Sequence, residues 1–322
     1  MNARNTPQLD LLTSKLMADL PKSDWHSSMI KILSSATRVV RRPAPGLYLA
    51  ATPIGNAADI SVRALATLAA SDVVLCEDTR VTAKLLSLYD INIKLQSYHD
   101  HNAATVRPLI LKHLQNNAVV VQVSDAGTPL INDPGYKLVL HAVHHGIPVT
   151  TLPGATSPIA ALTLSGLPTD RFLYAGFPPA KTSARRTFFD EMSMIPATLV
   201  FLESARRLPK SLEDMIPAMG LRQAAVCREL TKKFEEIRRG TVQELSALYA
   251  QEGSPRGETV LVVGPPLEDD TLWSAKRIDT ALRAAIKDGM RVKEAATSIS
   301  DFSGWRKQDV YRRAVWLSTT QE

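Results

Sequence analysis

Apolar runs of strand length alternate with segments of helical periodicity through most of the chain. Buried strands are predicted where apolar residues follow one another, as in GLYLAA at 46–51 and AVVVQV at 118–123. Between such runs, apolar residues recur every three or four positions, as they do at 62–69. This alternation predicts a parallel, doubly wound α/β sheet.

The same pattern can be followed along the chain. In the first part, the expected strands and helices are 46–51, 62–69, 72–76, 82–89, 94–98, 106–114, 118–123, 136–145, 146–152 and 159–164. A second α/β unit is expected from 171–177, 183–192, 198–202, 208–219, 224–230, 242–251 and 259–263. Two α/β domains are therefore predicted.

The end of the chain lacks the alternation of strands and helices. Gly264-Pro265-Pro266 breaks the pattern, and three short helices are expected at 275–286, 292–299 and 305–317. The last two have the size of a helix-turn-helix, which favours nucleic-acid binding, although small helical bundles are also common as packing modules. The domains predicted are a flexible basic N-terminal extension, two α/β domains and a helical tail domain, at 1–45, 46–168, 169–266 and 270–322.

Composition narrows the class of protein. Of 322 residues, 45% are hydrophobic and 22% are charged, as in soluble globular proteins. No apolar run approaches the roughly 18 residues of a membrane span. The two cysteines, Cys76 and Cys227, are far apart in sequence, and residues 1–30 lack the apolar core of a signal peptide. Reduced thiols and a cytoplasmic location are expected.

The net charge of +6 is unevenly distributed. Residues 1–45 contain seven Lys/Arg and three Asp/Glu, and residues 270–322 contain ten and seven. Basic ends on a nearly neutral body suit a polyanionic partner. Solvated surface charge explains the same numbers equally well.

The segment SDAGTPLINDPG, at 124–135, follows the apolar run 118–123 directly. Two Gly, two Pro and two Asp exclude a helix or a regular strand here. In parallel α/β sheets, ligands bind at loops of this kind, at the carboxyl ends of the strands. Asp125 supplies an acceptor for hydroxyl or ammonium donors, while a plain turn rich in breakers is the alternative.

Several familiar sites are missing from the sequence. It has no GxxxxGK[ST], HExxH, CxxC or GxSxG motif, and no GxGxxG follows the first strand. Small-residue loops at strand ends remain, with carboxylates at Asp78, Asp125, Glu203 and Glu229. These suit a nucleoside-like cofactor better than a polyphosphate. The residues alone predict a two-domain α/β transferase with a nucleoside-like ligand and no metal.

Eight motifs extend this interpretation. They are ATPIGN at 51–56, EDTR at 77–80, SYHDHN at 97–102, SDAGTPLINDPGY at 124–136, SGLPTDRF at 165–172, GFPPAK at 176–181, FLES at 201–204 and RELTKKFEEIRRG at 228–240. In this order the set resembles the ribosomal RNA small subunit methyltransferase I family, within the tetrapyrrole-methylase-like (class III) enzymes. The resemblance runs from about Gly46 to Pro266 and is weaker in the tail.

The resemblance implies an activity and a cofactor. The activity is 2′-O-methylation of a cytidine ribose in 16S rRNA at the decoding centre of the 30S subunit. The cofactor is S-adenosyl-L-methionine, folded into a cleft between the two domains of each subunit of a homodimer. The residues implied to bind it are Pro53, Asp125, Ala126, Gly127, Thr128, Thr156, Ser157, Leu202, Glu203 and Leu230.

The chain departs from the family pattern in two of these loops. It has Ala155-Thr156 where the family often has Pro-Ser or Pro-Cys, and Leu202 where the family usually has Tyr. Both differences could alter how the adenine is held.

Methyl transfer to a ribose hydroxyl needs alignment of the reacting atoms and a route for the proton, for which a base helps. The candidate bases are Glu77, Asp78, Glu203 and Glu229, and each is alternatively a hydrogen-bonding carboxylate at a strand end. Predicted phosphate contacts, alternatively ordinary surface charges, are Arg80, Lys181, Arg185, Arg207 and Lys232. Tyr98 or Phe177 would stack on an extruded base.

Two other functions remain open from the sequence. One is a methylase that keeps the fold and acts on a tetrapyrrole, against which SYHDHN, RELTKK and the basic tail argue. The other is a non-catalytic rRNA-binding assembly factor that retains the cofactor pocket.

Overall fold

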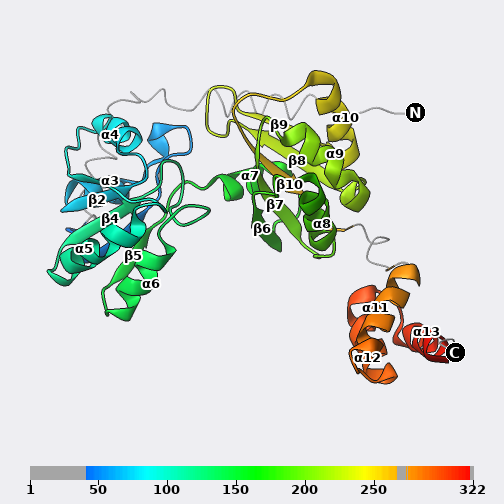
Figure 1. The fold of residues 1–322 in the computed structure, drawn as a ribbon. Coiled ribbons are helices and arrows are strands. Elements are labelled where there is room, and N and C mark those ends of the chain that lie inside the picture. The colour runs from blue at the N-terminus through cyan, green and yellow to red at the C-terminus, as the bar shows by residue number, and fades with distance from the viewer. Residues whose placement is uncertain (1–40, 267–272, 274, 320–322) are drawn as a thin grey trace, which may run out of the picture. The chain divides into compact units, whose positions relative to one another are not determined.

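The structure is a computed structural model that describes residues 41–266, 273 and 275–319. The predicted N-terminal extension lies outside these residues, apart from its last few positions. The chain divides into two compact units (Figure 1). Among the described residues, unit 1 contains 41–53 and Ala57–Ala155, and unit 2 contains Ile54–Asn56 and those from Thr156 onward. The division falls after Ala155, ahead of the boundary predicted at 168.

Unit 1 has a five-stranded sheet in the order β3-β2-β4-β1-β5, in which every pair of neighbours is parallel. The strands are β1 (Gly46–Ala50), β2 (Val73–Cys76), β3 (Leu95–Ser97), β4 (Val119–Val123) and β5 (Val149–Leu152). The helices are η1 (Ala57–Asp59), α3 (Val62–Ala69), α4 (Thr79–Ser87), α5 (Ala103–Gln115) and α6 (Tyr136–His144). The predicted parallel sheet is confirmed.

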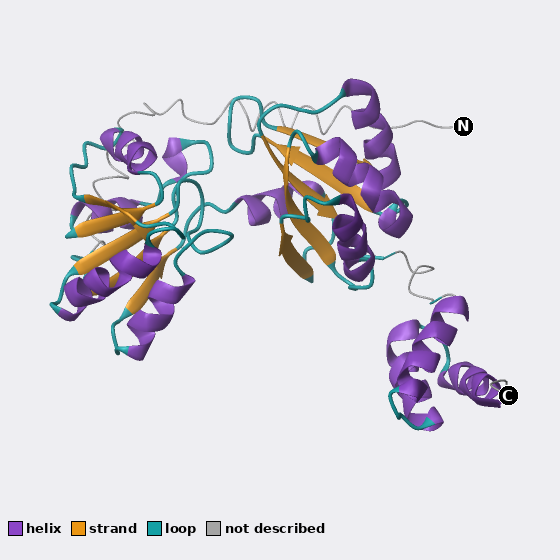
Figure 2. Cartoon of the chain, viewed as in Figure 1, coloured by secondary structure: helices purple, strands orange, loops and turns teal. Residues whose placement is uncertain are grey.

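The central strand β4 explains why its sequence is apolar without alternation. Val120 packs in a core that includes residues of α5 and α6, whereas Val121 packs in another with residues of α3 and α4. Successive side chains of a strand point to opposite faces, so a sheet covered by helices on both faces requires a continuous apolar run (Figure 2).

Unit 2 has a mixed sheet in the order β6-β7-β10-β8-β9. Only β6 and β7 run parallel; the other neighbours are antiparallel. The strands are β6 (Phe172–Gly176), β7 (Thr198–Ser204), β8 (Gln223–Arg228), β9 (Glu236–Thr241) and β10 (Glu258–Val263). The helices of this part are α7 (Ser157–Ser165), α8 (Thr182–Met192), α9 (Leu208–Met219) and α10 (Val242–Glu252).

Strand β9 was not among the predicted elements. Its sequence, EIRRGT, contains three charged residues, and the strand lies at the edge of the sheet. An edge strand can expose one side to solvent, so it needs no apolar run. Its pairing with β8 is what reveals it.

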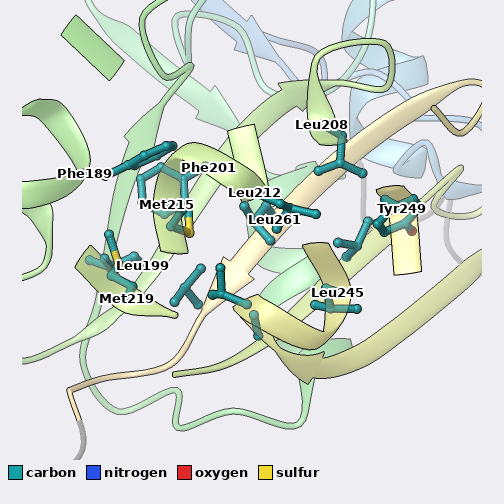
Figure 3. Packing of buried hydrophobic residues seen from close by; sticks show 14 residues of the cluster. Phe189, Leu199, Phe201, Leu208, Leu212, Met215, Met219, Leu245, Tyr249 and Leu261 are labelled. Carbon is teal, nitrogen blue, oxygen red and sulfur yellow. The ribbon is translucent and has the colours of Figure 1, made fainter. Parts of the chain in front are cut away.

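The main core of unit 2 packs α8, α9 and α10 against the sheet (Figure 3). Phe189 of α8 meets Phe201 of β7 edge to face, with ring centroids 5.8 Å apart. Leu212 and Met215 of α9 and Leu261 of β10 are buried in the same core. Helix α7 packs against β7, β8, β9 and β10, which is why it belongs to this unit.

The helical tail forms a small core of its own. Its helices are α11 (Ala275–Lys287), α12 (Val292–Ser303) and α13 (Lys307–Thr319). Ile278, Leu282 and Val310 are fully buried between them, and the Arg313 guanidinium of α13 donates two hydrogen bonds to Asp279 of α11. The three predicted helices are confirmed. None of the helices in the described ranges is long and apolar enough to cross a membrane.

Candidate active site

Three loops at the carboxyl edge of the unit 1 sheet are tied together by hydrogen bonds. After β1, the Thr52 amide donates to the Gly127 carbonyl at 2.9 Å, and the Gly127 amide donates back at 3.0 Å. The Thr128 hydroxyl donates to the carbonyl of Ala155, in the loop after β5, at 3.1 Å. The loop after β4 is thereby fixed on both sides.

Small residues leave the backbone of this edge accessible. Gly127 has φ +86°, which a residue with a side chain rarely adopts. A Cβ on Gly154 would come within 2.9 Å of the Cβ of Ala51. Ala126 is exposed, Thr128 is half-buried and Pro53 is buried. A ligand can therefore approach the backbone at Ala126 and Gly154, which are exposed, whereas Gly127 is buried.

The second half of the 124–135 loop is held from the centre of the sheet. The buried Gln122 side chain donates from Nε2 to the Pro134 carbonyl at 2.7 Å. Gly135 has φ +135°, and a Cβ there would lie 2.2 Å from that nitrogen. Glycine is thus required at the point where the loop passes Gln122 and enters α6.

Asp125 is exposed at the start of this loop and accepts a hydrogen bond from the Asp78 amide at 3.2 Å. It is one of several carboxylates gathered at this edge. Burial raises the pKa of Glu77 to about 7, and the charges of Asp133, Asp125 and Asp100 add to this effect. Burial and Asp125 also raise the pKa of Asp133, against the hydrogen bond from Ser124. The edge therefore carries a negative potential.

Asp78, next to Glu77 in the sequence, caps a helix and binds an arginine. Its side chain caps α4 by accepting the Arg80 amide at 2.9 Å, and the Arg80 guanidinium donates to it at 2.6 and 3.0 Å. These bonds lower the pKa of Asp78 to about 2. A carboxylate held so firmly in its charged form is a poor acceptor for a proton at neutral pH. The Arg80 side chain itself is 89% exposed.

The loop after β3 brings Asp100 toward Glu77. The Asn102 side chain accepts from the His99 amide at 2.9 Å and donates to the Ser97 carbonyl at 3.0 Å, while the Ser97 hydroxyl donates to the Glu77 carbonyl at 3.3 Å. Tyr98 is 2% exposed and packs in the core, so the expected stacking of its ring on a base does not fit.

Asp100 and Asp133 were not among the predicted site residues. Both lie in loops that follow parallel strands, and this position in the sequence could have identified them as site residues. Their proximity to Glu77 depends on the strand order β3-β2-β4, because β3 and β4 flank β2, and Glu77 directly follows β2.

In unit 2, Glu203 is buried with its carboxylate bonded inside the protein. It accepts from the Ser211 hydroxyl and from the Ser204 amide, the latter at 2.8 Å, and its oxygen lies 3.3 Å from Arg207 Nε. Its side chain has no exposed surface. The prediction of Glu203 as a base or a cofactor ligand through its side chain does not fit this place in the core.

Glu229 and Lys232 form an ion pair in the loop after β8. Lys232 Nζ donates to Glu229 at 2.9 Å and to Glu258 at 2.8 Å. This pairing and the Glu258 amide lower the pKa of Glu229. Glu229 was predicted as a base, but its lowered pKa makes it a weak proton acceptor. Lys232 was predicted to contact phosphate, but it is already bound to two carboxylates.

The same loop is conformationally strained. Glu229 has φ +50° and Thr231 has φ +64°, a region that β-branched residues rarely occupy. The Thr231 hydroxyl accepts from the Asn56 amide at 3.1 Å, and its own amide donates to Glu235 at 2.7 Å. Leu230, between the two strained residues, is 6% exposed.

The remaining predicted cofactor residues of unit 2 lie at element ends. Thr156 precedes α7 with extended backbone and Ser157 begins that helix. Leu202 is half-buried in β7, beside Glu203.

The five predicted phosphate contacts fall into two groups. Arg185 is 3% exposed and is bound to Asp214, so it is a core residue. Arg207 donates to the Pro178 carbonyl at 2.6 Å and pairs with Glu203, which makes it a structural link as well. Lys181 is exposed, and so is Phe177, at 52%. Arg80 is exposed as well, although its guanidinium is bound to Asp78 at the surface. The exposed side chains are the ones that RNA can reach.

The fold is that of one class of methyltransferases. A family model described as Tetrapyrrole (Corrin/Porphyrin) Methylases matches residues 46–246. A solved structure titled as the methyltransferase CobJ has the same fold, with a TM-score of 0.52 and 17% identity, over 68% of this chain and 94% of that one.

Curated relatives are similar over almost the whole chain. One from Mesorhizobium japonicum is 48% identical over 287 residues, which is 88% of this chain and 96% of the relative. One from Escherichia coli O157:H7 is 42% identical over 273 residues, covering 84% and 94%. Both are named ribosomal RNA small subunit methyltransferase I. The chain belongs to this family, within the tetrapyrrole methylases.

Proposed function

We propose that the protein transfers a methyl group from S-adenosyl-L-methionine to 16S rRNA in the 30S subunit, at the 2′-hydroxyl of a cytidine in the decoding centre. The observation that carries the proposal is the 48% identity to a relative of that name over 88% of the chain. The nucleotide and the ribose position rest on the family resemblance. An rRNA substrate implies action in the cytoplasm.

The carboxyl edge of unit 1 fits this cofactor. S-adenosyl-L-methionine carries a sulfonium and an ammonium group, and when bound it supplies an activated methyl group. The carboxylates of Asp100, Asp125 and Asp133, which add to the effect of burial on the pKa of Glu77, favour such cations and would repel a polyphosphate. We assign Asp125 to hydroxyl or ammonium donors, and Ala126, Gly127 and Thr128 to the adjoining backbone contacts, with Pro53 fixing the loop after β1. Contacts from Thr156, Ser157, Leu202 and Leu230 stay a prediction.

Glu77 is the best placed of the four candidate bases. A base works best when its pKa lies near the working pH, because it is then partly deprotonated and still accepts a proton readily. Asp78, Glu203 and Glu229 are each held by a cation or by internal hydrogen bonds. In this proposal Glu77 removes the proton of the ribose hydroxyl, and the neighbouring carboxylates keep its proton affinity high.

RNA contacts are proposed for the exposed residues only. Arg80 and Lys181 would bind phosphates, and Phe177 would stack on a base. The side chains of Arg185, Arg207 and Lys232 are buried or partly buried and bound to carboxylates, so they would instead support the loops of unit 2.

The expected homodimer is also a proposal. Helix α6 exposes an apolar stripe made of Tyr136, Leu140 and Val143, of which Tyr136 is 69% and Val143 is 60% exposed. Positions i, i+4 and i+7 lie on one face of a helix, and exposed apolar patches commonly mark interfaces. Sedimentation of Tyr136→Ser/Val143→Ser should give a lighter species than the parent protein if this stripe contributes to the dimer.

Transfer of tritiated methyl groups from S-adenosyl-L-methionine to purified 30S subunits tests the activity, and nuclease mapping of the labelled nucleotide tests the position. Label in a single 16S rRNA nucleotide whose bond resists alkaline cleavage is expected, because a 2′-O-methyl group blocks that cleavage. Label on a tetrapyrrole instead, or binding to 30S subunits without transfer, would contradict the proposal.

A further inference from the structure

The described part of the helical tail has an excess of positive charge. Residues 275–319 contain ten Lys/Arg and five Asp/Glu, a difference of +5. Two of the acidic side chains are already paired, Asp279 with Arg313 and Asp309 with Arg312. The surface of this small domain is therefore strongly cationic.

A groove of about 480 Å³ opens between α11 and the end of α13. It is lined by Arg283, Ala284, Ile286, Lys287, Leu317 and Ser318. Three of these residues are apolar, two carry positive charge and one has a hydroxyl group. A nucleotide has matching parts, since its base and sugar have apolar faces and its phosphate is an anion.

The two cations of the groove act together. Arg283 and Lys287 are four residues apart, so they lie on the same face of α11, and both side chains are exposed. Neither has an ion pair within the described part of the chain, whereas Arg313 of the adjacent helix is bound to Asp279. Their charge is available to an external anion.

We propose that this groove binds a segment of RNA, with phosphates at Arg283 and Lys287 and a base or ribose against Ile286 and Leu317. The groove would be a second anchor on the RNA, separate from the candidate active site. Identification of that RNA as ribosomal RNA rests on the proposed function.

The adjoining helix supports RNA over other anionic partners. Tyr311 and Trp316 of α13 are 44% and 55% exposed, and Arg312 lies between them in sequence with its side chain 81% exposed. Aromatic rings and guanidinium groups stack on unpaired bases, which RNA offers and an acidic protein surface does not.

The test compares two full-length double variants with the same loss of charge. Arg283→Gln/Lys287→Gln changes the groove, and Lys293→Gln/Lys307→Gln removes two exposed cations near the starts of α12 and α13. Binding to 30S subunits is measured over a series of salt concentrations, together with calorimetric binding of S-adenosyl-L-methionine and methyl transfer at limiting subunit concentration. Both variants should bind the cofactor like the parent, because neither changes a residue assigned or predicted to contact the cofactor.

The groove variant should bind 30S subunits at least ~10-fold more weakly at moderate salt. Its plot of log affinity against log salt should be shallower by about 1.4 to 2, since each of the two lost phosphate contacts removes roughly 0.7 to 1 from the slope. The control variant should stay within about 2-fold. Equal behaviour of the two variants would overturn the groove assignment. Weaker binding to anionic lipid vesicles with unchanged RNA binding would also overturn it, in favour of a membrane surface. A parent protein that transfers no methyl group would instead contradict the proposed function, whatever its affinity for RNA.

Discussion

The carboxyl edges of the two sheets use the same residue type in opposite ways. In unit 1, burial raises the pKa of Glu77 to about 7, and the charges that act on this residue, those of three nearby carboxylates, add to the shift. In unit 2, Glu203 meets Arg207, and Glu229 meets Lys232. Apart from Asp78, which pairs with Arg80, the acidic residues that follow the strands of unit 1 form a negatively charged surface, whereas Glu203 and Glu229 of unit 2 form ion pairs.

The difference shows how to distinguish a carboxylate that takes part in the reaction from one that stabilises the fold. A carboxylate paired with a cation keeps its charge and holds loops together, so its removal should cost stability. A carboxylate crowded by others gains proton affinity at the expense of stability, and such groups concentrate at functional sites. The following variants test this separation, from the largest expected effect to the smallest.

Glu77→Gln should lower kcat for methyl transfer to 30S subunits by roughly 10² to 10⁴, because a positioned base contributes about that factor. Binding of S-adenosyl-L-methionine should change far less. Glu229→Gln in unit 2 is the matched control and should keep kcat within several-fold of the parent. Equal losses in the two variants would remove the distinction between the two edges.

The raised pKa of Glu77 also predicts how stability and activity change with pH. The folded-state pKa of Glu77 is raised from its ordinary value near 4.5 to about 7. The folded protein therefore holds a proton between these values that the unfolded chain has lost, so stability falls as pH rises through this window. Glu77→Gln should melt at a higher temperature than the parent at pH 8, with little difference at pH 4.5. The parent activity should rise with pH and level off above about 7, a step that the variant lacks.

Glu203→Ala should lower the free energy of unfolding of unit 2 by about 3 kcal/mol, because it leaves the partly buried Arg207 without its carboxylate. Urea unfolding followed by fluorescence measures the change. Glu213→Ala, which removes an exposed partner of Lys210, should stay within about 0.5 kcal/mol. A stable Glu203→Ala protein with greatly reduced kcat would assign Glu203 to the reaction instead.

Asp125→Ala should weaken binding of S-adenosyl-L-methionine about 10- to 100-fold in calorimetry, the effect of losing a hydrogen bond to a charged group. Asp190→Ala, an exposed carboxylate of α8, is the control and should bind the cofactor like the parent. Unchanged affinity in Asp125→Ala would take the loop after β4 out of the cofactor site.

Lys181→Ala should have the smallest effect, a several-fold loss of affinity for 30S subunits and a salt dependence shallower by about 1. Its long side chain is exposed, unlike that of Arg185 four residues later. A flat response to Lys181→Ala across a salt series would leave the exposed cations of unit 2 without a role in RNA binding.

Most of the fold could be predicted because its elements are encoded locally. Parallel strands of unit 1 are buried on both faces and appear as apolar runs, and the helices between them keep their periodicity. Helix α4 was expected to begin near Thr82 but begins at Thr79, because Asp78 caps it. Strand β9 has no local signal at all, since it depends on its pairing with β8.

The site was predictable in position but not in role. The sequence indicated which loops reach the carboxyl edge, and Asp125 is exposed there. The sequence could not show that Arg185 is buried and bound to Asp214, 29 residues away in the chain. Nor could it show that Glu203 accepts a hydrogen bond from Ser211. Burial and pairing depend on residues brought together by the fold, and the same residue type is reactive or structural according to them.

Thr231 shows how a protein can retain a residue that its own backbone disfavours. Glycine would relax the φ of +64° at this position, and methods that stabilise proteins by choosing locally preferred residues would select it. Glycine cannot replace the hydroxyl that accepts the Asn56 amide. An engineered variant optimised only for thermal stability would therefore free residues 54–56 from this anchor, and the gain in melting temperature would hide a loss of order in the ATPIGN segment.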